Sequence, residues 1–100
     1  MVGLVVSVAS GCEIALTGRL DVHSVAEVRT LLQAAVDAGR GDLVVDVSGV
    51  ELVDLIGLGV LVGADRRAKL AGRRMVLRGA GSRLVRLLRA TGLHRVLTVG

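Results

Sequence analysis

Apolar residues along this chain recur with two different periods, and the shorter period predicts strands. Residues 3–9 and 12–18 are rich in Val, Ile and Leu, and they are joined near Ser10-Gly11, a pair suited to a hairpin turn. Three further apolar runs of strand length follow at residues 42–47, 74–78 and 95–99. The sequence therefore predicts a hairpin followed by three separated strands.

Between these strands the apolar residues recur every three or four positions, which predicts helices. The first helix should follow Ser24, where Ser24 and Glu27 form a capping-box pattern, and should end at Gly39. Two more helices are predicted at residues 55–71 and 82–91. The predicted order is ββαβαβαβ, which favours one α/β domain over residues 1–100, with helices packed against a mixed sheet.

The composition supports a folded domain without a membrane span. Apolar residues make up 52% of the chain with no aromatic residue and no proline, so the core must consist of Val, Leu, Ile and Ala. The uncharged run Leu55 to Ala64 has ten residues, about half the roughly 20 that a membrane span needs. The N-terminus lacks the basic leader of a secretory signal, and the single Cys12 cannot form an intramolecular disulfide. We expect a cytoplasmic protein.

Charge is distributed unevenly between the two halves of the sequence. Residues 1–50 hold three basic and six acidic residues, and residues 51–100 hold ten basic and three acidic residues. The basic residues include Arg83, Arg86 and Arg89 on one arc of the predicted helix 82–91. Such a surface is most simply solvated, but it can also meet an acidic protein or nucleic acid. Without aromatic residues the chain has no platform for stacking bases, so nucleic-acid binding rests on charge alone.

The predicted helix 55–71 has two faces. With about 100° of rotation per residue, its small and apolar residues share one broad side, which should face the sheet. These residues are Gly57, Val60, Leu61, Ala64, Ala68 and Ala71. On the opposite arc Leu55, Leu58 and Val62 line up with Asp65, Arg66 and Lys69. Because a charged stripe faces water, we expect these three aliphatic residues to be exposed and to form a binding surface, unless another element covers them.

No pattern indicates catalysis, a metal or a cofactor. The glycines at 57, 59 and 63 do not have the spacing of a dinucleotide-binding loop, and they lie inside the predicted helix. Ser48 lies in Asp-Val-Ser-Gly, which is not a Gly-x-Ser-x-Gly nucleophile elbow, and the Ser48-Gly49 pair predicts a turn between the strand and a loop. His23 has no second ligand at metal-binding spacing.

Three segments carry a resemblance to a known family. Asp54-Leu-Ile-Gly-Leu-Gly59 is similar to the Asp-Ser-Ser/Thr-Gly-Leu-Gly pattern that begins a helix in the STAS family (sulfate transporter and anti-sigma factor antagonist domains). Leu16-Thr-Gly-Arg-Leu-Asp21 resembles its Gly-x-Leu-Asp segment, and residues 85–96 resemble its Leu-x-x-Thr-Gly-Leu run. The order and spacing of the three segments imply a STAS-like domain over nearly the whole chain.

The resemblance implies a non-catalytic interaction module. It would bind an anti-sigma factor of serine-kinase type and free a sigma factor. Asp54 should cap the helix, worth about 1 kcal/mol, and by resemblance helps to fix the loop that the kinase recognises, while Asp21 braces the neighbouring loop. The predicted partner-binding residues are Asp21, Asp54, Leu55, Ile56, Gly57, Leu58 and Val62.

The family's two hydroxyl positions are aliphatic in this chain. They correspond to Leu55 and Ile56, and Ile56 stands where the partner kinase phosphorylates other members. Other interpretations stay open: a STAS subunit of another assembly such as a stressosome or a lipid-transport complex, a homodimer formed through the helix stripe, or a small basic nucleic-acid-binding protein. Nucleic-acid binding and membrane insertion are not expected.

Overall fold

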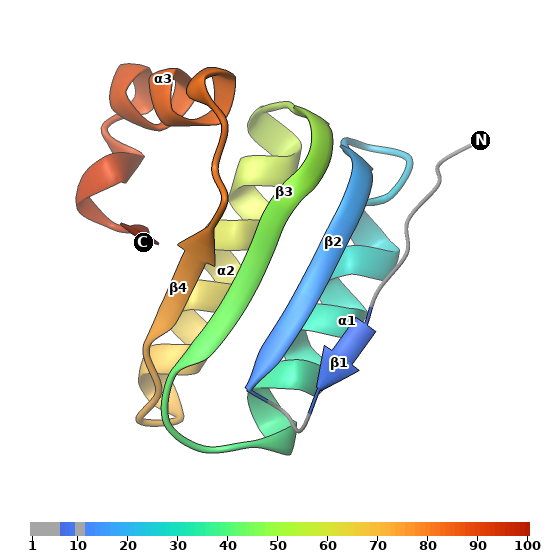
Figure 1. The fold of residues 1–100 in the computed structure, drawn as a ribbon, viewed down its shortest axis with the longest axis vertical. Coiled ribbons are helices and arrows are strands. Elements are labelled where there is room, and N and C mark those ends of the chain that lie inside the picture. Colours follow the sequence, from blue (N-terminus) through green and yellow to red (C-terminus); the bar gives the residue numbers. More distant parts are fainter. Residues whose placement is uncertain (1–6, 10–11) are drawn as a thin grey trace.

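Five strands form one mixed sheet in the computed structural model, which describes residues 7–9 and 12–100 (Figure 1). In spatial order these are β1 (Ser7–Ala9), β2 (Glu13–Leu20), β3 (Leu43–Val53), β4 (Met75–Arg78) and β5 (Thr98–Val99). β1 pairs antiparallel with β2, and the other neighbours pair in parallel. The helices are α1 (Val25–Ala38), α2 (Leu55–Leu70) and α3 (Ser82–Thr91), with a 3₁₀ turn at Leu93–Arg95. The predicted α/β class, mixed sheet and element order are confirmed.

α1 and α2 cover one face of the sheet and leave the other without a helix (Figure 1). The strand order follows the chain order, so the successive crossovers all step in the same direction across the sheet. Right-handed crossovers that step in one direction place their helices on the same face. The covered face carries alternate residues of the strands, among them Ile14 and Leu16 of β2 and Val45 of β3, which are fully buried. The buried hydrophobic core consists of aliphatic side chains and Met75.

β3 is longer than the sequence predicts. The prediction ended the strand at residue 47 and placed a turn at Ser48-Gly49, whereas the strand continues to Val53. The pairing between β2 and β3 shifts register twice, between Ala15 and Thr17 and between Gly18 and Arg19, so that the longer β3 pairs along β2. At Gly49 a side chain would lie 2.6 Å from Thr17 Cγ2, so glycine allows the two strands to stay close. The glycine that suggested a turn therefore belongs to an irregular strand.

The start of α1 differs from the predicted capping box. Ser24 occupies the N-cap position, but its hydroxyl does not cap the helix. Instead Ser24 Oγ donates to the backbone carbonyl of Arg19 at 2.5 Å and accepts from the backbone amide of Asp21 at 3.2 Å. The hydroxyl thus fixes the loop between β2 and α1. The predicted hairpin turn at residues 10 and 11 lies outside the described residues.

A buried arginine stabilises the other end of α1. Arg73, in the loop between α2 and β4, is 4% exposed, and its guanidinium donates to the carbonyls of Ala35, Val36 and Gly41 at 2.9 Å each. The last carbonyls of a helix lack partners within the helix, and a cation near them is favourable. Arg73 is therefore structural and does not contribute to a basic binding surface.

Candidate functional site

The junction between β3 and α2 is held by Asp54. Its carboxylate Oδ1 accepts a hydrogen bond from the backbone amide of Gly57 at 2.8 Å, which caps the first turn of α2. Its own amide donates to the carbonyl of Leu20 at the end of β2, at 3.2 Å. The predicted cap is confirmed, and Asp54 also ties the start of the helix to the neighbouring strand.

Gly57 lets the first turn of α2 lie directly on the end of β2. A Cβ atom at this position would lie 2.2 Å from the carbonyl oxygen of Leu20, which is far inside van der Waals contact. No residue with a side chain fits without moving the backbone. As a result the loop after β2 and the loop after β3 leave the sheet side by side.

The loop after β2 is braced by its own polar groups. Asp21 Oδ1 accepts from the backbone amide of His23 at 2.9 Å, and the carbonyl of Asp21 accepts from the amide of Val25 at 2.9 Å. The bracing role predicted for Asp21 is confirmed, while its part in partner binding stays a prediction. His23 is exposed and lies in this loop.

Large aliphatic side chains are exposed where these two loops meet. Val22 is 58% exposed, Leu52 45%, Leu55 67% and Ile56 49%. We call these four residues the end patch, since they lie at the carboxyl ends of β2 and β3 and at the start of α2. The other large apolar residues exposed in the described part of the chain lie elsewhere, at Leu70, Val96 and Val99. An apolar cluster held on a rigid junction is typical of a protein-binding surface.

The predicted exposure of Leu58 is wrong. Leu58 is 1% exposed and belongs to the aliphatic core together with Leu61, while Val62 is half-buried. The prediction relied on Asp65, Arg66 and Lys69 to mark the water-facing side of α2. Asp65 is itself 2% exposed and pairs with Lys69 at 3.0 Å. Because a buried carboxylate was read as a solvated one, the exposed face was placed too far around the helix.

The exposed face of α2 carries Gly59 and Gly63 in place of the predicted leucine. A Cβ atom at either position would meet nothing within 4 Å. Both glycines border a shallow groove beside Arg29 and Gln33 of α1. The middle of this face, between the end patch and the exposed Arg66, Arg67 and Leu70, therefore carries no side chain at Gly59 and Gly63.

Four of the ten basic residues in the second half of the chain form ion pairs within the described structure, and a fifth, Arg73, binds backbone carbonyls. Arg67 binds Asp37 and Arg74 binds Asp42, each at 2.7 Å. Lys69 pairs with Asp65, and the buried Arg73 binds backbone carbonyls, so these side chains are also engaged within the domain. Within the described part of the chain, the basic residues of α3 pair with no carboxylate; they are Arg83, Arg86 and Arg89. Folding therefore pairs part of the basic half with acidic residues of the first half and leaves α3 as a basic surface.

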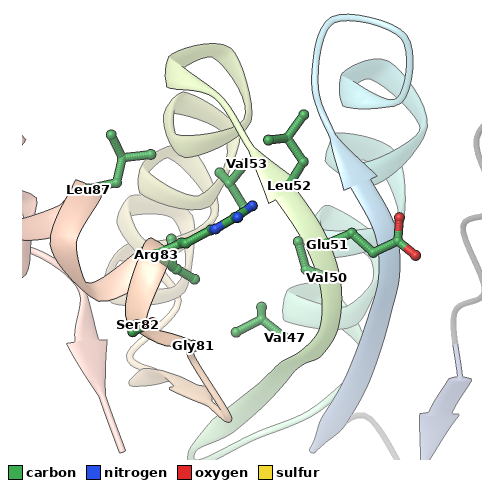
Figure 2. A pocket seen from close by; sticks show the side chains of 10 residues that line it. Val47, Val50, Glu51, Leu52, Val53, Gly81, Ser82, Arg83 and Leu87 are labelled. Carbon is green, nitrogen blue, oxygen red and sulfur yellow. The ribbon is translucent and has the colours of Figure 1, made fainter.

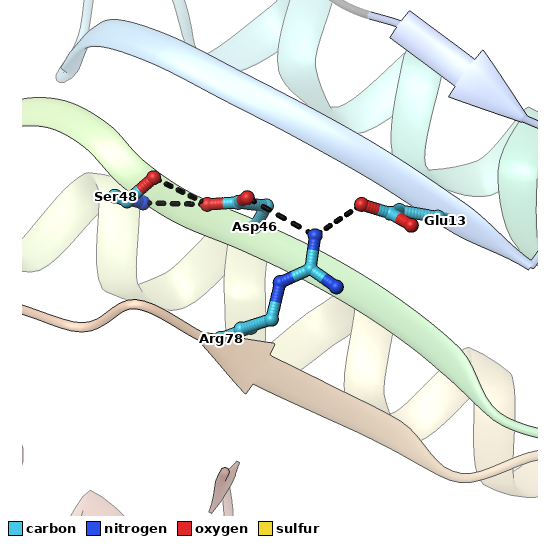
Figure 3. A network of polar contacts seen from close by, with 4 residues as sticks. All are labelled: Glu13, Asp46, Ser48 and Arg78. Carbon is cyan, nitrogen blue, oxygen red and sulfur yellow. Dashed lines mark hydrogen bonds and ion pairs between the residues drawn. The ribbon is translucent and has the colours of Figure 1, made fainter.

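A polar network crosses the face of the sheet that no helix covers (Figure 3). Arg78 of β4 bridges Glu13 of β2 and Asp46 of β3. Asp46 Oδ1 also accepts from the hydroxyl of Ser48 at 2.6 Å and from its amide at 2.9 Å. These hydrogen bonds, and then that of Arg78, lower the pKa of Asp46 from 3.8 to about 2. A carboxylate so stabilised in its charged form is a poor general base at neutral pH, and its partners give it a structural role.

Comparison with known proteins identifies the family. The sequence matches the family model described as "Mlab, STAS domain" over residues 5–98. The chain belongs to the STAS family. It is 30% identical over 87 residues to an anti-sigma-B factor antagonist of Staphylococcus aureus (strain NCTC 8325 / PS 47), covering 87% of this chain and 81% of that protein.

Solved structures of STAS proteins share the fold. A putative anti-sigma factor antagonist from Thermotoga maritima superposes with a TM-score of 0.78 at 18% identity, covering 96% of this chain and 84% of that one. The Bacillus cell fate determinant SpoIIAA in its phosphorylated form gives a TM-score of 0.72 at 17% identity, covering 98% and 91%. At these identities the likeness shows the fold alone.

Family membership indicates a regulatory binding protein. STAS proteins of the anti-sigma factor antagonist type are regulatory binding proteins, and this STAS chain is not an enzyme. Among the described residues no group of three His, Cys, Asp or Glu side chains could hold a metal ion. Nor does any helix described here have the length and apolarity to cross a membrane.

Proposed function

We propose that this STAS domain binds an anti-sigma factor of serine-kinase type through the end patch and thereby releases a sigma factor in the bacterial cytoplasm. The observation that supports this most is the exposure of Leu55 and Ile56 at a helix start that Asp54 and Gly57 hold rigid. A preorganised apolar surface loses little entropy on binding, so its burial contributes to affinity. Of the predicted contact residues, Leu58 acts only by supporting this surface from the core.

We further propose that binding is not controlled by phosphate at the start of α2. Phosphorylation would place roughly −2 charge there, and one relative has been solved in a phosphorylated form. In this chain both Leu55 and Ile56 lack a hydroxyl group. The nearby Ser24 is 1% exposed and engaged in the loop, whereas Ser48 is exposed. The protein should therefore bind constitutively, or take its regulation from another position such as Ser48.

The end patch can be tested with aspartate substitutions along α2. Leu55→Asp and Ile56→Asp should abolish binding to the host's serine-kinase anti-sigma factors, measured by titration calorimetry, while the melting temperature stays within a few degrees. Substitutions at exposed positions typically change the free energy of unfolding by no more than about 0.5 kcal/mol. Leu70→Asp is the matched control, because Leu70 is 86% exposed at the far end of the same helix, and it should bind normally.

Two further results would show whether the end patch is the interface. Leu61→Asp should unfold the domain, since an unpaired charge in the core costs several kcal/mol. If Leu55→Asp and Ile56→Asp are folded and still bind like the wild type, the end patch is not the interface.

A second candidate is a STAS subunit of another assembly, such as a stressosome or a lipid-transport complex. It is favoured by the match to the Mlab family model together with the aliphatic residues at 55 and 56. Isolation of the protein with its native partners distinguishes the two, because an anti-sigma factor would be recovered in one case and a larger complex in the other. Nucleic-acid binding is disfavoured by the ion pairs of Arg67 and Arg74.

A further inference from the structure

A groove of about 300 Å³ lies between the second half of β3 and α3 (Figure 2). Its apolar walls are Val47, Val50, Leu52 and Val53 of β3 with Leu84 and Leu87 of α3. Leu52 also belongs to the end patch, so the groove continues that exposed apolar surface toward α3. None of the features described so far accounts for it.

The groove carries a positive charge at its rim. The guanidinium of Arg83 reaches from α3 toward Leu52 and Val53, whereas the carboxylate of Glu51 points the opposite way, toward β2 (Figure 2). Arg83 makes no ion pair within the described part of the chain, and neither do the exposed Arg86 and Arg89 farther along the helix. The rim is therefore an uncompensated basic surface beside an apolar one.

The first turn of α3 adds to this positive potential. Its N-cap is Gly81, which offers no side chain, and no described side chain caps the turn or places an acidic group in it. Helix N-termini favour negative charge, yet this one carries Arg83. A carboxylate supplied by another molecule would gain a charge-assisted hydrogen bond from Arg83 and a favourable position at the helix start.

We propose that this groove binds an acidic amphipathic segment of a partner protein. Apolar side chains of the segment would lie against Val50, Leu84 and Leu87, and a carboxylate would pair with Arg83. A second copy of this chain is a poor occupant, because its net charge is +4 and its own α3 is basic. The proposal extends the proposed function, since a partner seated on the end patch could also reach the groove through Leu52.

The groove can be tested without knowledge of the partner. The uniformly ¹⁵N-labelled chain is titrated with an acetylated, amidated peptide of repeated Glu-Glu-Leu-Leu units, and with the same peptide in which lysine replaces glutamate. The acidic peptide should cause saturable amide shifts at Val50, Arg83 and Leu87, and the lysine peptide should not. Arg83→Glu should lower the affinity for the acidic peptide at least about tenfold, which corresponds to about 1.4 kcal/mol. Arg89→Glu, which lies outside the groove, should change this affinity less than twofold.

Several outcomes would overturn the proposal. These are the absence of saturable shifts in the groove, equal affinity in Arg83→Glu, and shifts that depend on protein concentration alone, which would indicate a self-interface. Groove shifts caused by decanoate but not by the acidic peptide would assign the site to a small amphipathic anion instead. Because neither peptide is an anti-sigma factor, a negative peptide titration does not test the end patch. Likewise, a failure to bind an anti-sigma factor does not change the result of the peptide titration.

Discussion

Three glycines of α2 have different physical roles, although the sequence presents them alike. Gly57 touches the carbonyl of Leu20, while Gly59 and Gly63 face open space. Glycine inside a helix costs about 0.8–1.0 kcal/mol relative to alanine. No contact within the described structure requires glycine at 59 or 63, and both lie on the same face of α2 as the end patch.

Alanine substitution should therefore have opposite effects along this helix. Gly59→Ala and Gly63→Ala should each raise the free energy of unfolding by about 0.4–1 kcal/mol, since alanine restricts the unfolded chain and fits the helix. Gly57→Ala should lower it by more than that, because the new Cβ must displace the backbone of β2. Urea denaturation followed by circular dichroism measures all three. A stabilised Gly57→Ala would mean that the first turn of α2 does not rest on β2.

Residue 56 allows a direct test of the missing phosphate acceptor. Ile56→Ser restores a hydroxyl at the family position, and serine is well tolerated near a helix start. Incubated with ATP and the host's anti-sigma kinases, this variant should gain phosphate at residue 56 by mass spectrometry, while the wild type gains none at residues 55 or 56. Failure of every kinase to modify Ile56→Ser would indicate that the partner is no longer a kinase.

At the scale of elements, the sequence predicted existence and order better than ends and faces. The strand and helix pattern gave the correct order, because aliphatic periodicity reflects which face is buried. The prediction failed where tertiary contacts decide: Gly49 is held against Thr17 rather than in a turn, and the Ser24 hydroxyl bonds to the preceding loop rather than to α1.

The same distinction applies to the candidate site. Its position at the β3–α2 junction and the Asp54 cap could be predicted, because capping is local. Burial of Leu58 and Asp65 could not, since it depends on how α2 lies against its neighbours. Leu52 was missed because the strand was predicted to end before it, and Val22 because one valine in a loop carries no periodic signal. The basic arc of α3 could be predicted from its sequence, but the groove beside Arg83 depends on the extra length of β3.

The whole molecule should lose stability in acid through the network that joins β2, β3 and β4. The pKa of Asp46 is about 2 in the folded protein and 3.8 ordinarily, so the unfolded chain binds more protons between these values. The stability that ionised Asp46 contributes is fully present above about pH 4 and is lost as the pH falls toward 2. The pKa of Asp37 is lowered as well, mainly through the hydrogen bond from Arg67.

Asp46→Asn isolates this effect. The variant keeps an oxygen to accept from Ser48 but cannot titrate, so its free energy of unfolding should fall less steeply between pH 4.5 and pH 2 than that of the wild type. Urea titrations at several pH values measure the slope. Equal slopes for the two proteins would show that Asp46 is not held ionised by its neighbours.

The order of the strands has a consequence for how the protein is made. Each new parallel strand joins the free edge of the strands that precede it, and none has to insert between two already paired. Each parallel pairing therefore joins two strands that are separated along the chain by only one helical segment. A chain emerging from the ribosome could add one strand-helix unit after another, and the two-residue β5 then closes the growing edge with little left for another chain to pair with.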